Sequence, residues 1–564
     1  MARARIAAIS LLSRNAWLAL VLAVSVVVTG VVWNTRAAAG ADAYGYVSQA
    51  DLWSNRALFI DQQFTASAPW PLARWTFTPL GYRPDPAGYR IVPSYSPGLP
   101  MLMAVASVVA GECAKFWIVP LAGGLMVLAT YWIGVRIGRP WVGVTAAWLV
   151  ATSPTMLFML VAPMSDVPAA AAWAMAVVFA IDETAPAAAA SGLAAAIAIL
   201  VRPNLVPLTA IVGVWTLFGG RKLSTTGDTE DTEHLSSFSP RPLRPPWGRV
   251  QVVRFLIFAA TSSIGAIAIA VINARLYGSP LASGYGDLSD AYAWSYVVPN
   301  LRRYGEWLLS TETPLAVAGL ASLFVPWSIV WPTRDARRVL WLLASVAAGV
   351  WASYLIYVPW DAWWYLRFVL PAWPMMTIGA ASLIAALCRA RSTAWRVAVV
   401  AAVIAIGVFN VKRAVRLNVF NLASAEAKYV ETATVVESIA PPDAVIICGQ
   451  FSGSLRYYAG RLTLRWDYLD PTWLDRAVEW LTARGHHVYI LLEAPEVDPF
   501  RARFAPANAL GRVDWVPLVT FRGRSIQLHD TQHRERFDRP IEPRALRAVR
   551  ECPPPRPPPQ LRMP

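Results

Sequence analysis

The sequence predicts a mainly α-helical, polytopic membrane protein with about eleven transmembrane helices and a small C-terminal α/β domain. The 564 residues are 56% hydrophobic and only 15% charged, a balance that soluble domains do not show. Apolar runs of 16–25 residues recur along the chain, and this length crosses a bilayer. Many of the 27 tryptophans stand at the ends of these runs, as Trp33 and Trp351 do, where indole rings favour the membrane–water interface.

The apolar run over 97–111 is interpreted as a re-entrant or surface helix. Its 15 residues would reach about 22 Å as a helix, short of a hydrocarbon core of about 30 Å. The first long run is taken as a retained helix because further spans follow it. The predicted spans lie at 16–34, 115–135, 141–160, 166–182, 186–201, 204–220, 250–276, 313–331, 339–358, 365–388 and 395–414.

The distribution of basic residues predicts the orientation of these spans. Lys and Arg collect in cytoplasmic loops. With the N-terminus inside and 97–111 not crossing, the inner segments hold sixteen Lys or Arg and the short outer loops hold three. If 97–111 crossed the membrane, most of those sixteen charges would lie outside. We therefore expect the first loop, 35–114, and the C-terminal domain on the outer side.

The chain divides into three predicted regions. Residues 1–416 form the transmembrane domain, 417–538 form the α/β domain outside the membrane, and 539–564 form a disordered Pro- and Arg-rich tail. In the α/β domain, the predicted elements are strands at 444–449 and 487–493, a helix at 470–485 capped by Asp470 and ended at Gly485, and a final hairpin within 515–530.

Composition excludes several classes of function. The net charge is +15, but the basic residues are scattered among loops, which argues against nucleic-acid binding. His486 and His487 precede a predicted strand and are interpreted as a turn, and P-loop, dinucleotide-binding and HExxH patterns are absent from the sequence. The four cysteines are far apart without metal-ligand spacing, and we expect all of them to be unpaired: Cys113, Cys388, Cys448 and Cys552.

Two carboxylates are predicted at outer membrane boundaries. Asp42 follows the first span and Asp166 opens the fourth. Asp166 fits a plain helix cap equally well, because carboxylates favour helix N-termini. In a helix over 43–58, Asp42 would share one face with three side chains suited to a polar ligand. These substrate-cleft candidates are Tyr46, Gln49 and Trp53.

Two arginines, Arg202 and Arg367, are predicted at the same level. A charge within or beside a span is costly and marks function by default, although an arginine can also extend its charged end to the interface. The planar guanidinium suits phosphate oxygens. Together with the two carboxylates, the arginines predict a site that binds phosphate and accepts a proton.

Six short stretches, spread over residues 40–375, occur in the order seen in a known superfamily. They are "GADAYGYVSQA", "YSPGLPMLMA", "VGVTAAWLVATSPTMLFMLVAPMSDVPAA", "RPNLVPL", "YGSPLASGYG" and "WWYLRFVLPAWP". The chain resembles the GT-C membrane glycosyltransferases of the protein O-mannosyltransferase superfamily, and among them the bacterial members related to lipid A aminoarabinose transferase. The first loop departs from that pattern, since Ala41 and Ala43 flank Asp42 and no basic residue precedes "SPGLP".

The resemblance implies an enzyme that takes a sugar from a polyprenyl-phosphate donor and passes it to a glycan, lipid or protein acceptor. It implies Asp42 and Asp166 as the catalytic carboxylates and Arg367 and Arg202 as donor-phosphate ligands. Tyr95 and Tyr285 lie in matching stretches and join the predicted substrate cleft. A divalent metal cation near Asp42 and Asp166 is left open as a cofactor.

The resemblance also implies a multi-pass protein of the bacterial inner membrane, in contact with membrane lipids. Two alternatives stay open. A lipid or sugar transporter or flippase would usually show paired repeats and charges near mid-span. A catalytically inactive GT-C relative would serve as a scaffold through its C-terminal domain.

Overall fold

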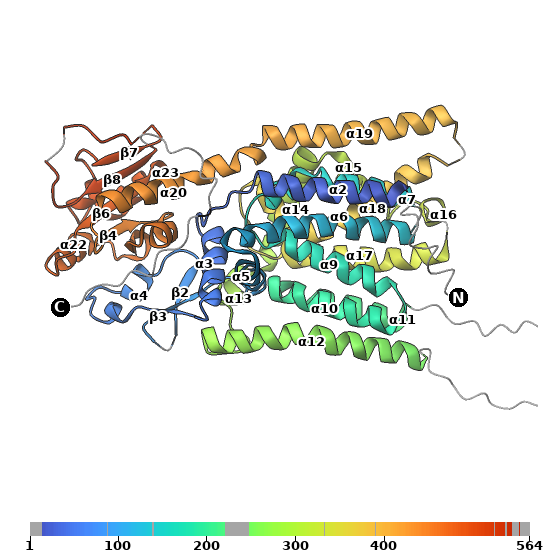
Figure 1. Ribbon diagram of the computed structural model, residues 1–564, viewed down its shortest axis with the longest axis horizontal. Coiled ribbons are helices and arrows are strands. Elements are labelled where there is room, and N and C mark those ends of the chain that lie inside the picture. The colour runs from blue at the N-terminus through green and yellow to red at the C-terminus, as the bar shows by residue number, and fades with distance from the viewer. Residues whose placement is uncertain are drawn as a thin grey trace, which may run out of the picture.

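The computed structural model describes residues 14–543, except 87, 138–139, 220–247, 332, 390, 524 and 536–537, together with Cys552. It is an elongated molecule with a helix bundle at one end and a mixed α/β unit at the other (Figure 1). The bundle comprises α2 (Arg14–Val32), α6 (Ile118–Ile137), α7 (Pro140–Ala151), α8 (Pro154–Leu160), α9 (Asp166–Ile181), α10 (Ala185–Val201), α11 (Pro207–Phe218), α12 (Arg249–Tyr277), α15 (Pro314–Ala321), α16 (Trp327–Val330), α17 (Arg334–Leu355), α18 (Trp373–Leu387) and α19 (Thr393–Arg416).

The helices of the described residues bear out a polytopic membrane protein, but not eleven full-length spans. Six are long and apolar enough to cross a bilayer, and a seventh span forms if α7 and α8 are counted together across their 62° bend. Ser153 and Pro154 produce this bend, because the Ser153 hydroxyl caps α8 by accepting from Met156 N and Pro154 starts the new helix. Helices α9, α10 and α11 are shorter than a typical span.

The predicted single span over 313–331 is instead two short helices, α15 and α16. Pro326 separates them, and proline cannot continue a helix from the preceding turn. The long apolar faces of α12 and α19 remain exposed along the outside of the bundle. Such faces in a polytopic protein are the ones that meet lipid.

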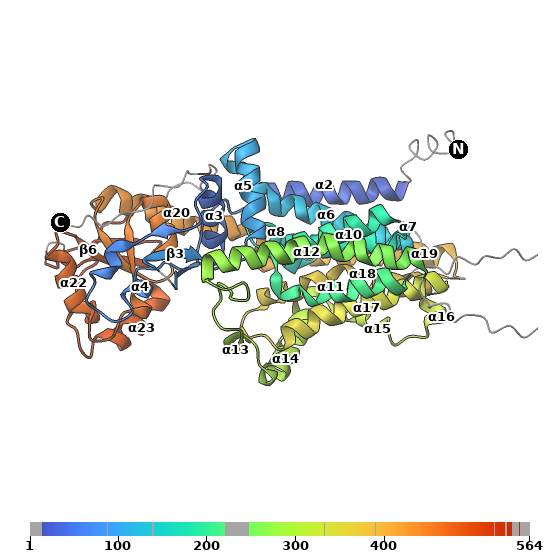
Figure 2. The same cartoon turned by 90° about the horizontal axis from the view of Figure 1, so that it is seen from below.

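The run over 97–111 forms α5 (Gly98–Ala110), a short helix that does not run with the bundle. Figure 2 shows α5 and α3 (Asp42–Ser54) standing across the direction of α2, α10 and α12, at the end of the bundle nearest the α/β unit. Helix α3 begins at Asp42, so this residue lies in the first turn of the helix.

The C-terminal unit contains a five-stranded sheet of order β5-β4-β6-β8-β7. Three strands are parallel and the last two form the predicted antiparallel hairpin. Its elements are α20 (Leu422–Ile439), β4 (Val445–Cys448), β5 (Leu462–Arg465), α22 (Leu474–Thr482), β6 (Val488–Glu493), α23 (Ala494–Phe504), β7 (Val519–Phe521) and β8 (Ile526–Asp530). Every residue of β4 is buried, as expected of a central strand covered on both faces.

Helix α22 begins later than predicted. Asp470 accepts hydrogen bonds from Thr472 N (2.9 Å) and Thr472 Oγ1 (2.7 Å), closing a turn ahead of the helix. The helix itself starts at Leu474. Asp470 therefore stabilises a local Asx-type turn, an alternative that short polar side chains offer to the backbone. Gly485 adopts the left-handed φ of +81° after the helix end, where glycine is least strained.

The first loop and the C-terminal sheet share one hydrophobic core. The loop contains a small sheet of β1 (Ile60–Asp61), β2 (Tyr82–Pro84) and β3 (Arg90–Pro93), with the short helix α4 (Ala73–Thr76). Phe64, Trp70 and Phe77 of this loop are buried against the strands and helices of the sheet. The Arg456 guanidinium donates to the carbonyl oxygen of Phe77, so the loop is held by polar and apolar contacts together.

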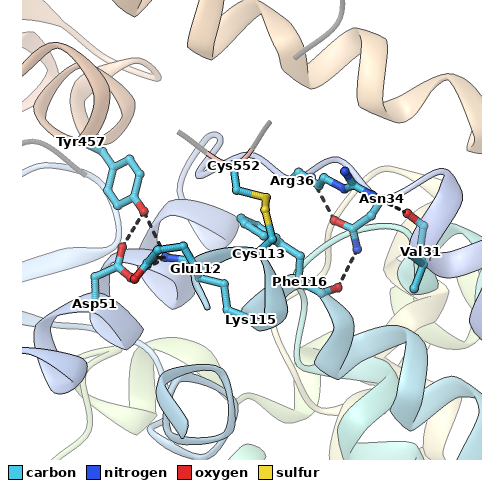
Figure 3. The surroundings of a disulfide bond; sticks show 10 residues. All are labelled: Val31, Asn34, Arg36, Asp51, Glu112, Cys113, Lys115, Phe116, Tyr457 and Cys552. Carbon is cyan, nitrogen blue, oxygen red and sulfur yellow. Dashed lines mark hydrogen bonds and ion pairs between the residues drawn. A yellow bond between two sulfur atoms is a disulfide. The ribbon is translucent and has the colours of Figure 1, made fainter. Parts of the chain in front are cut away.

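Two cysteines predicted to be unpaired form a disulfide. Cys113 precedes α6, and Cys552 lies in the region predicted as a disordered tail. Their separation of 439 residues gives no local pattern that a sequence could reveal. Figure 3 shows the bond beside an ionic cluster in which Lys115 contacts Asp51 and Glu112 while the Tyr457 hydroxyl donates to Asp51. Ile541, at the start of the same predicted tail, pairs with Val519 of the sheet, so this part is ordered and not disordered as predicted. Residues 544–551 and 553–564 lie outside the described residues.

We expect Phe77→Ala to destabilise the protein by about 3–5 kcal/mol, because it empties a fully buried aromatic site in the shared core. The measurement is the guanidinium-induced unfolding transition of the detergent-purified protein, followed by tryptophan fluorescence. Leu58→Ala in the same loop is the control, since Leu58 is exposed and should change stability by less than about 0.5 kcal/mol. Equal effects of the two variants would contradict the shared core.

Candidate active site

A cavity of about 860 Å³ lies where the bundle meets the α/β unit. Its wall combines residues far apart in sequence. They come from the start of α3, the loop before α5, the start of α9, the residues after α10, the loop after α12, the last turn of α17 and the 3-10 helix η6 (Trp363–Ala372). Glu426, Tyr429 and Gln450 of the C-terminal unit complete the wall. Seven of the nine predicted site residues line this cavity: Asp42, Tyr46, Tyr95, Asp166, Arg202, Tyr285 and Arg367.

Asp42 is the more accessible of the two predicted carboxylates. Its position in the first turn of α3 places negative charge at a helix N-terminus, where the helix dipole favours it. Oδ1 accepts from the Tyr95 hydroxyl at 2.5 Å, and Oδ2 accepts from Arg367 Nη2 at 3.0 Å. The side chain remains 33% exposed, so a ligand in the cavity can reach it.

Asp166 is fully buried and pairs with Arg202. Arg367 Nε lies 4.0 Å from the same oxygen, Oδ1. Ser165 does not cap α9 through its side chain. Its hydroxyl instead accepts from Tyr46 Oη (2.9 Å) and Arg202 Nε (3.3 Å). A plain capping role therefore does not account for this Ser–Asp pair, whose side chains are directed to the arginine.

Both arginines are fixed in place by their neighbours. Arg202 follows the last turn of α10 and donates from Nη1 to the Tyr354 hydroxyl at 2.9 Å. The Arg367 guanidinium lies 5.2 Å from the ring centres of Tyr365 and Phe368, a cation–π arrangement. Both side chains are largely buried and ion-paired. Their charged ends therefore contact other residues of the protein, unlike an arginine that extends to the membrane–water interface.

Three tyrosines form the aromatic part of the cavity wall. The Tyr95 ring lies 4.8 Å from Tyr46 and 5.8 Å from Tyr285, measured between ring centres. Burial, reinforced by the charge of Asp42, raises the pKa of Tyr95 well above its usual value. The hydroxyl therefore stays protonated and can donate to Asp42. Gly45 makes room for this ring, because a Cβ there would lie 2.2 Å from a Tyr95 ring carbon.

Gln49 and Trp53 do not line the cavity. They lie two and three turns beyond Asp42 on α3, so the shared helical face runs away from the site. Gln49 is completely buried, and both polar atoms of its amide lack a hydrogen-bond partner within the described chain. The helical periodicity was correct, but it could not show how much of that face the cavity reaches.

The carboxylates of this site do not suit a divalent cation. Three of their four oxygens already accept from Tyr95, Arg367 or Arg202. A cation bound to both residues would have to displace these donors and lie beside two guanidinium groups of the same charge, which is unfavourable. The arginines themselves supply the positive charge of this site.

Sequence reasoning missed several residues of the wall. Tyr354 and Tyr357 reach the cavity from the end of α17, and Glu426 and Gln450 come from beyond the last bundle helix. None of these carries a local motif. Ser165 could have been found from its position next to Asp166, but its role depends on Tyr46 and Arg202 arriving from other segments.

No protein-family model and no curated protein matches the chain. Among solved structures, it is similar to the oligosaccharyltransferase AglB of Archaeoglobus fulgidus in its apo form, with 11% identity over 94% of this chain and 75% of that one and a TM-score of 0.50. The chain has the GT-C fold. AglB in complex with an inhibitory peptide and a dolichol-phosphate also shares the GT-C fold with it, with 10% identity over 92% and 74% of the chains and a TM-score of 0.50. ArnT from Cupriavidus metallidurans, bound to undecaprenyl phosphate, matches with 12% identity over 87% and 96% of the chains and a TM-score of 0.49.

Asp166→Asn should destabilise the protein more than Asp42→Asn does. The first change leaves Arg202 buried without its counter-charge, a loss of about 3–5 kcal/mol for a broken buried pair. Asp42 is partly exposed, so in the Asp42→Asn variant water can replace part of the stabilisation that the carboxylate gives to the charge of Arg367. Thermal unfolding of the two purified variants beside the unsubstituted chain makes the comparison. A larger loss for Asp42→Asn would contradict this ranking.

Proposed function

We propose that the chain is an integral membrane glycosyltransferase that moves a sugar from a polyprenyl-phosphate carrier to an acceptor outside the cytoplasm. The archaeal AglB that shares its fold is complexed with an inhibitory peptide and a dolichol-phosphate, which supports a polyprenyl-phosphate ligand here. The proposal rests chiefly on one observation: two linked Asp–Arg pairs line a single cavity at the end of an apolar bundle. The apolar bundle suits the lipid chain of such a carrier, and the charged residues suit its phosphate group.

Asp42 is the proposed general base. It is the carboxylate that a ligand in the cavity can reach, because its side chain is 33% exposed and lines the cavity beside Arg367. The acceptor hydroxyl loses its proton to Asp42 while its oxygen forms a bond to the anomeric carbon of the sugar. The bond from that carbon to the carrier phosphate breaks, and the phosphate leaves with the electron pair. One displacement inverts the anomeric configuration.

Arg367 and Arg202 are the proposed ligands of the leaving phosphate. Arg367 lines the cavity and Nη2 donates to the accessible Asp42, so this guanidinium lies beside a ligand bound there. Positive charge placed where negative charge develops lowers the barrier without reorganisation. The phosphate leaves as a stable anion, and no general acid is needed. Asp166 acts as a positioning residue that holds both guanidiniums at this level.

The transporter alternative predicts charges near the middle of the bundle. In the described structure the four charged residues of the site instead line a cavity whose wall includes Glu426, Tyr429 and Gln450 of the α/β unit. This position favours chemistry at headgroup depth. Absence of any sugar transfer by the purified protein would instead favour an inactive scaffold.

We also propose that the protein lies in a bacterial inner membrane, with its C-terminal unit outside the cytoplasm. Figure 1 shows that α2 begins, α11 ends and α12 begins at the end of the bundle far from the α/β unit. Arg14 and Arg249 begin two of these helices at the far end, in keeping with a cytoplasmic location of that end. The Cys113–Cys552 disulfide lies near Tyr457 of the C-terminal unit (Figure 3), and disulfides persist in oxidising compartments outside the cytoplasm.

The activity test is incubation of the purified protein with labelled polyprenyl-phosphate sugars and envelope extract. We expect label to move to a glycan, lipid or protein, and the labelled product identifies which. Asp42→Asn should abolish this transfer, because the amide cannot accept the proton while its size and hydrogen bond to Tyr95 are kept. Asp61→Asn in the same loop is the control, since Asp61 is exposed, and should transfer normally. Transfer by Asp42→Asn within a few-fold of the unsubstituted chain would remove its assigned role.

Arg367→Ala should raise the donor concentration needed for half-maximal rate, with less effect on the acceptor. Loss of a charge-assisted contact costs about 1.5–3 kcal/mol, or about ten- to hundred-fold. Steady-state rates over a range of donor concentrations provide the measurement. Arg302→Ala is the matched control, because Arg302 is exposed and pairs only with Glu306 among the described contacts. Unchanged donor dependence in Arg367→Ala would exclude this arginine from donor binding.

Reporters fused to the end of the complete chain test the orientation. We expect alkaline phosphatase, which is active only outside the cytoplasm, to be active, and green fluorescent protein to be dark. A fluorescent, phosphatase-negative result would place the α/β unit and the adjoining cavity in the cytoplasm. This result would contradict sugar transfer on the outer side of the membrane. The arrangement of the residues in the cavity would still hold.

A further inference from the structure

Four of the five histidines of the chain lie in the C-terminal sheet unit. Two of these, His487 and His533, converge on Asp530. His487 directly precedes β6, Asp530 ends β8, and His533 follows in the turn after that strand. The proposed catalytic reaction uses none of them.

The three side chains present donor atoms at metal-ligand spacing. His487 Nε2 lies 2.9 Å from Asp530 Oδ1, and His533 Nδ1 lies 3.2 Å from Asp530 Oδ2. One nitrogen from each histidine and one carboxylate oxygen all fall within 4.8 Å of one another. In a tetrahedral zinc site with bonds of about 2.0–2.2 Å, neighbouring ligand atoms are about 3.3 Å apart. Small side-chain movements would therefore suffice to surround an ion.

The backbone that carries these ligands is firmly held. Tyr489 pairs with Asp530 across β6 and β8, and the Thr531 hydroxyl donates to Val488 O at 2.7 Å. The amides of Gln532 and His533 donate to Asp530 Oδ1 and orient the carboxylate, as partners of metal ligands do elsewhere. The His487 and His533 rings stack with their centres 5.4 Å apart. His533 is about half exposed, which leaves the site open to solvent on one side.

This cluster is separate from the proposed catalytic cavity. Strands β4 and β6 are parallel, so their C-terminal ends share one edge of the sheet. Gln450, just beyond β4, lines the cavity, whereas His487 stands before the start of β6. The six residues of β6 span about 20 Å. The cluster therefore lies near the opposite edge of the sheet from the cavity.

We propose that His487, Asp530 and His533 bind one divalent transition-metal ion, with zinc the preferred ion. Two imidazoles with one carboxylate suit zinc and its neighbours, whereas magnesium and calcium require oxygen ligands. Three protein ligands leave a fourth position for water. The ion joins the chain before β6 to the turn after β8. It stabilises this edge of the sheet by binding only the folded form.

Zinc binding to the complete chain tests the proposal. The protein is purified through a tag without histidines, stripped with a chelator and titrated with zinc chloride by calorimetry. His487→Gln and His533→Asn are the informative variants, because each amide nitrogen can still donate to Asp530 but cannot act as an imidazole ligand. His234→Ala, a histidine outside the sheet unit, and Asp42→Asn are the matched controls.

We expect one zinc per unsubstituted chain and per control chain. Each of the two variants should bind zinc more than about 100-fold more weakly, since even losing a residue that only orients a ligand costs about 10–100-fold. At free zinc 100 times the dissociation constant, the unfolded fraction of the unsubstituted chain should fall about 100-fold. Cobalt in place of zinc should give the intense visible absorption of a tetrahedral site, and this absorption should be lost in His487→Gln.

Three outcomes would overturn the proposal. The unsubstituted chain could bind no zinc, which would make the cluster a hydrogen-bonded turn only. His487→Gln and His533→Asn could bind zinc as the unsubstituted chain does. Zinc could instead be lost in Asp42→Asn alone, which would place the ion in the catalytic cavity. Since the variants keep the hydrogen bonds to Asp530, loss of binding without loss of the unfolding transition separates a ligand role from a folding defect.

Discussion

Asp166 can be buried at the end of an apolar bundle because Arg202 cancels its charge, and Arg367 links this pair to Asp42. A single charge in that position would cost several kcal/mol. Four segments must therefore meet at one level: the starts of α3 and α9, the end of α10 and the helix η6. The geometry of the cavity follows from this pairing, since each side chain is oriented by a partner from another segment.

The pairing requires α3 to be held across the end of the bundle, and the α/β unit provides that support. Tyr44 of α3 packs so closely on Gly453 that a Cβ there would lie 2.2 Å from the ring. Asp51, near the other end of α3, contacts Lys115 and Tyr457. The disulfide at Cys113 adds a covalent link beside this cluster. The α/β unit thus supports the helix that carries Asp42, in addition to supplying Glu426 and Gln450 to the cavity wall.

Much of the site could be predicted because its chemistry conflicts with its surroundings. Asp42, Asp166, Arg202 and Arg367 are charges at the edges of apolar runs, and such charges are conspicuous in any membrane sequence. The aromatic wall was harder to predict, since Tyr354 and Tyr357 look like ordinary interface residues. Gln49 and Trp53 were placed in the cleft by helical periodicity alone, which locates a face of α3 but not the extent of the cavity. The histidine cluster was taken for a turn, because Asp530 and His533 are more than forty residues from His487.

By itself the sequence determined the membrane class, the short non-bundle helix α5, the strands β4 and β6 and the hairpin of the C-terminal unit, and the four charged residues that line the cavity. These features depend on hydrophobicity, length and charge, which act locally along the chain. Only the tertiary structure decided the Cys113–Cys552 pairing, the core shared by the first loop and the sheet, and the partner of each charge. Those features depend on contacts between segments that are far apart along the chain, and a local pattern carries no record of which distant surface it will meet.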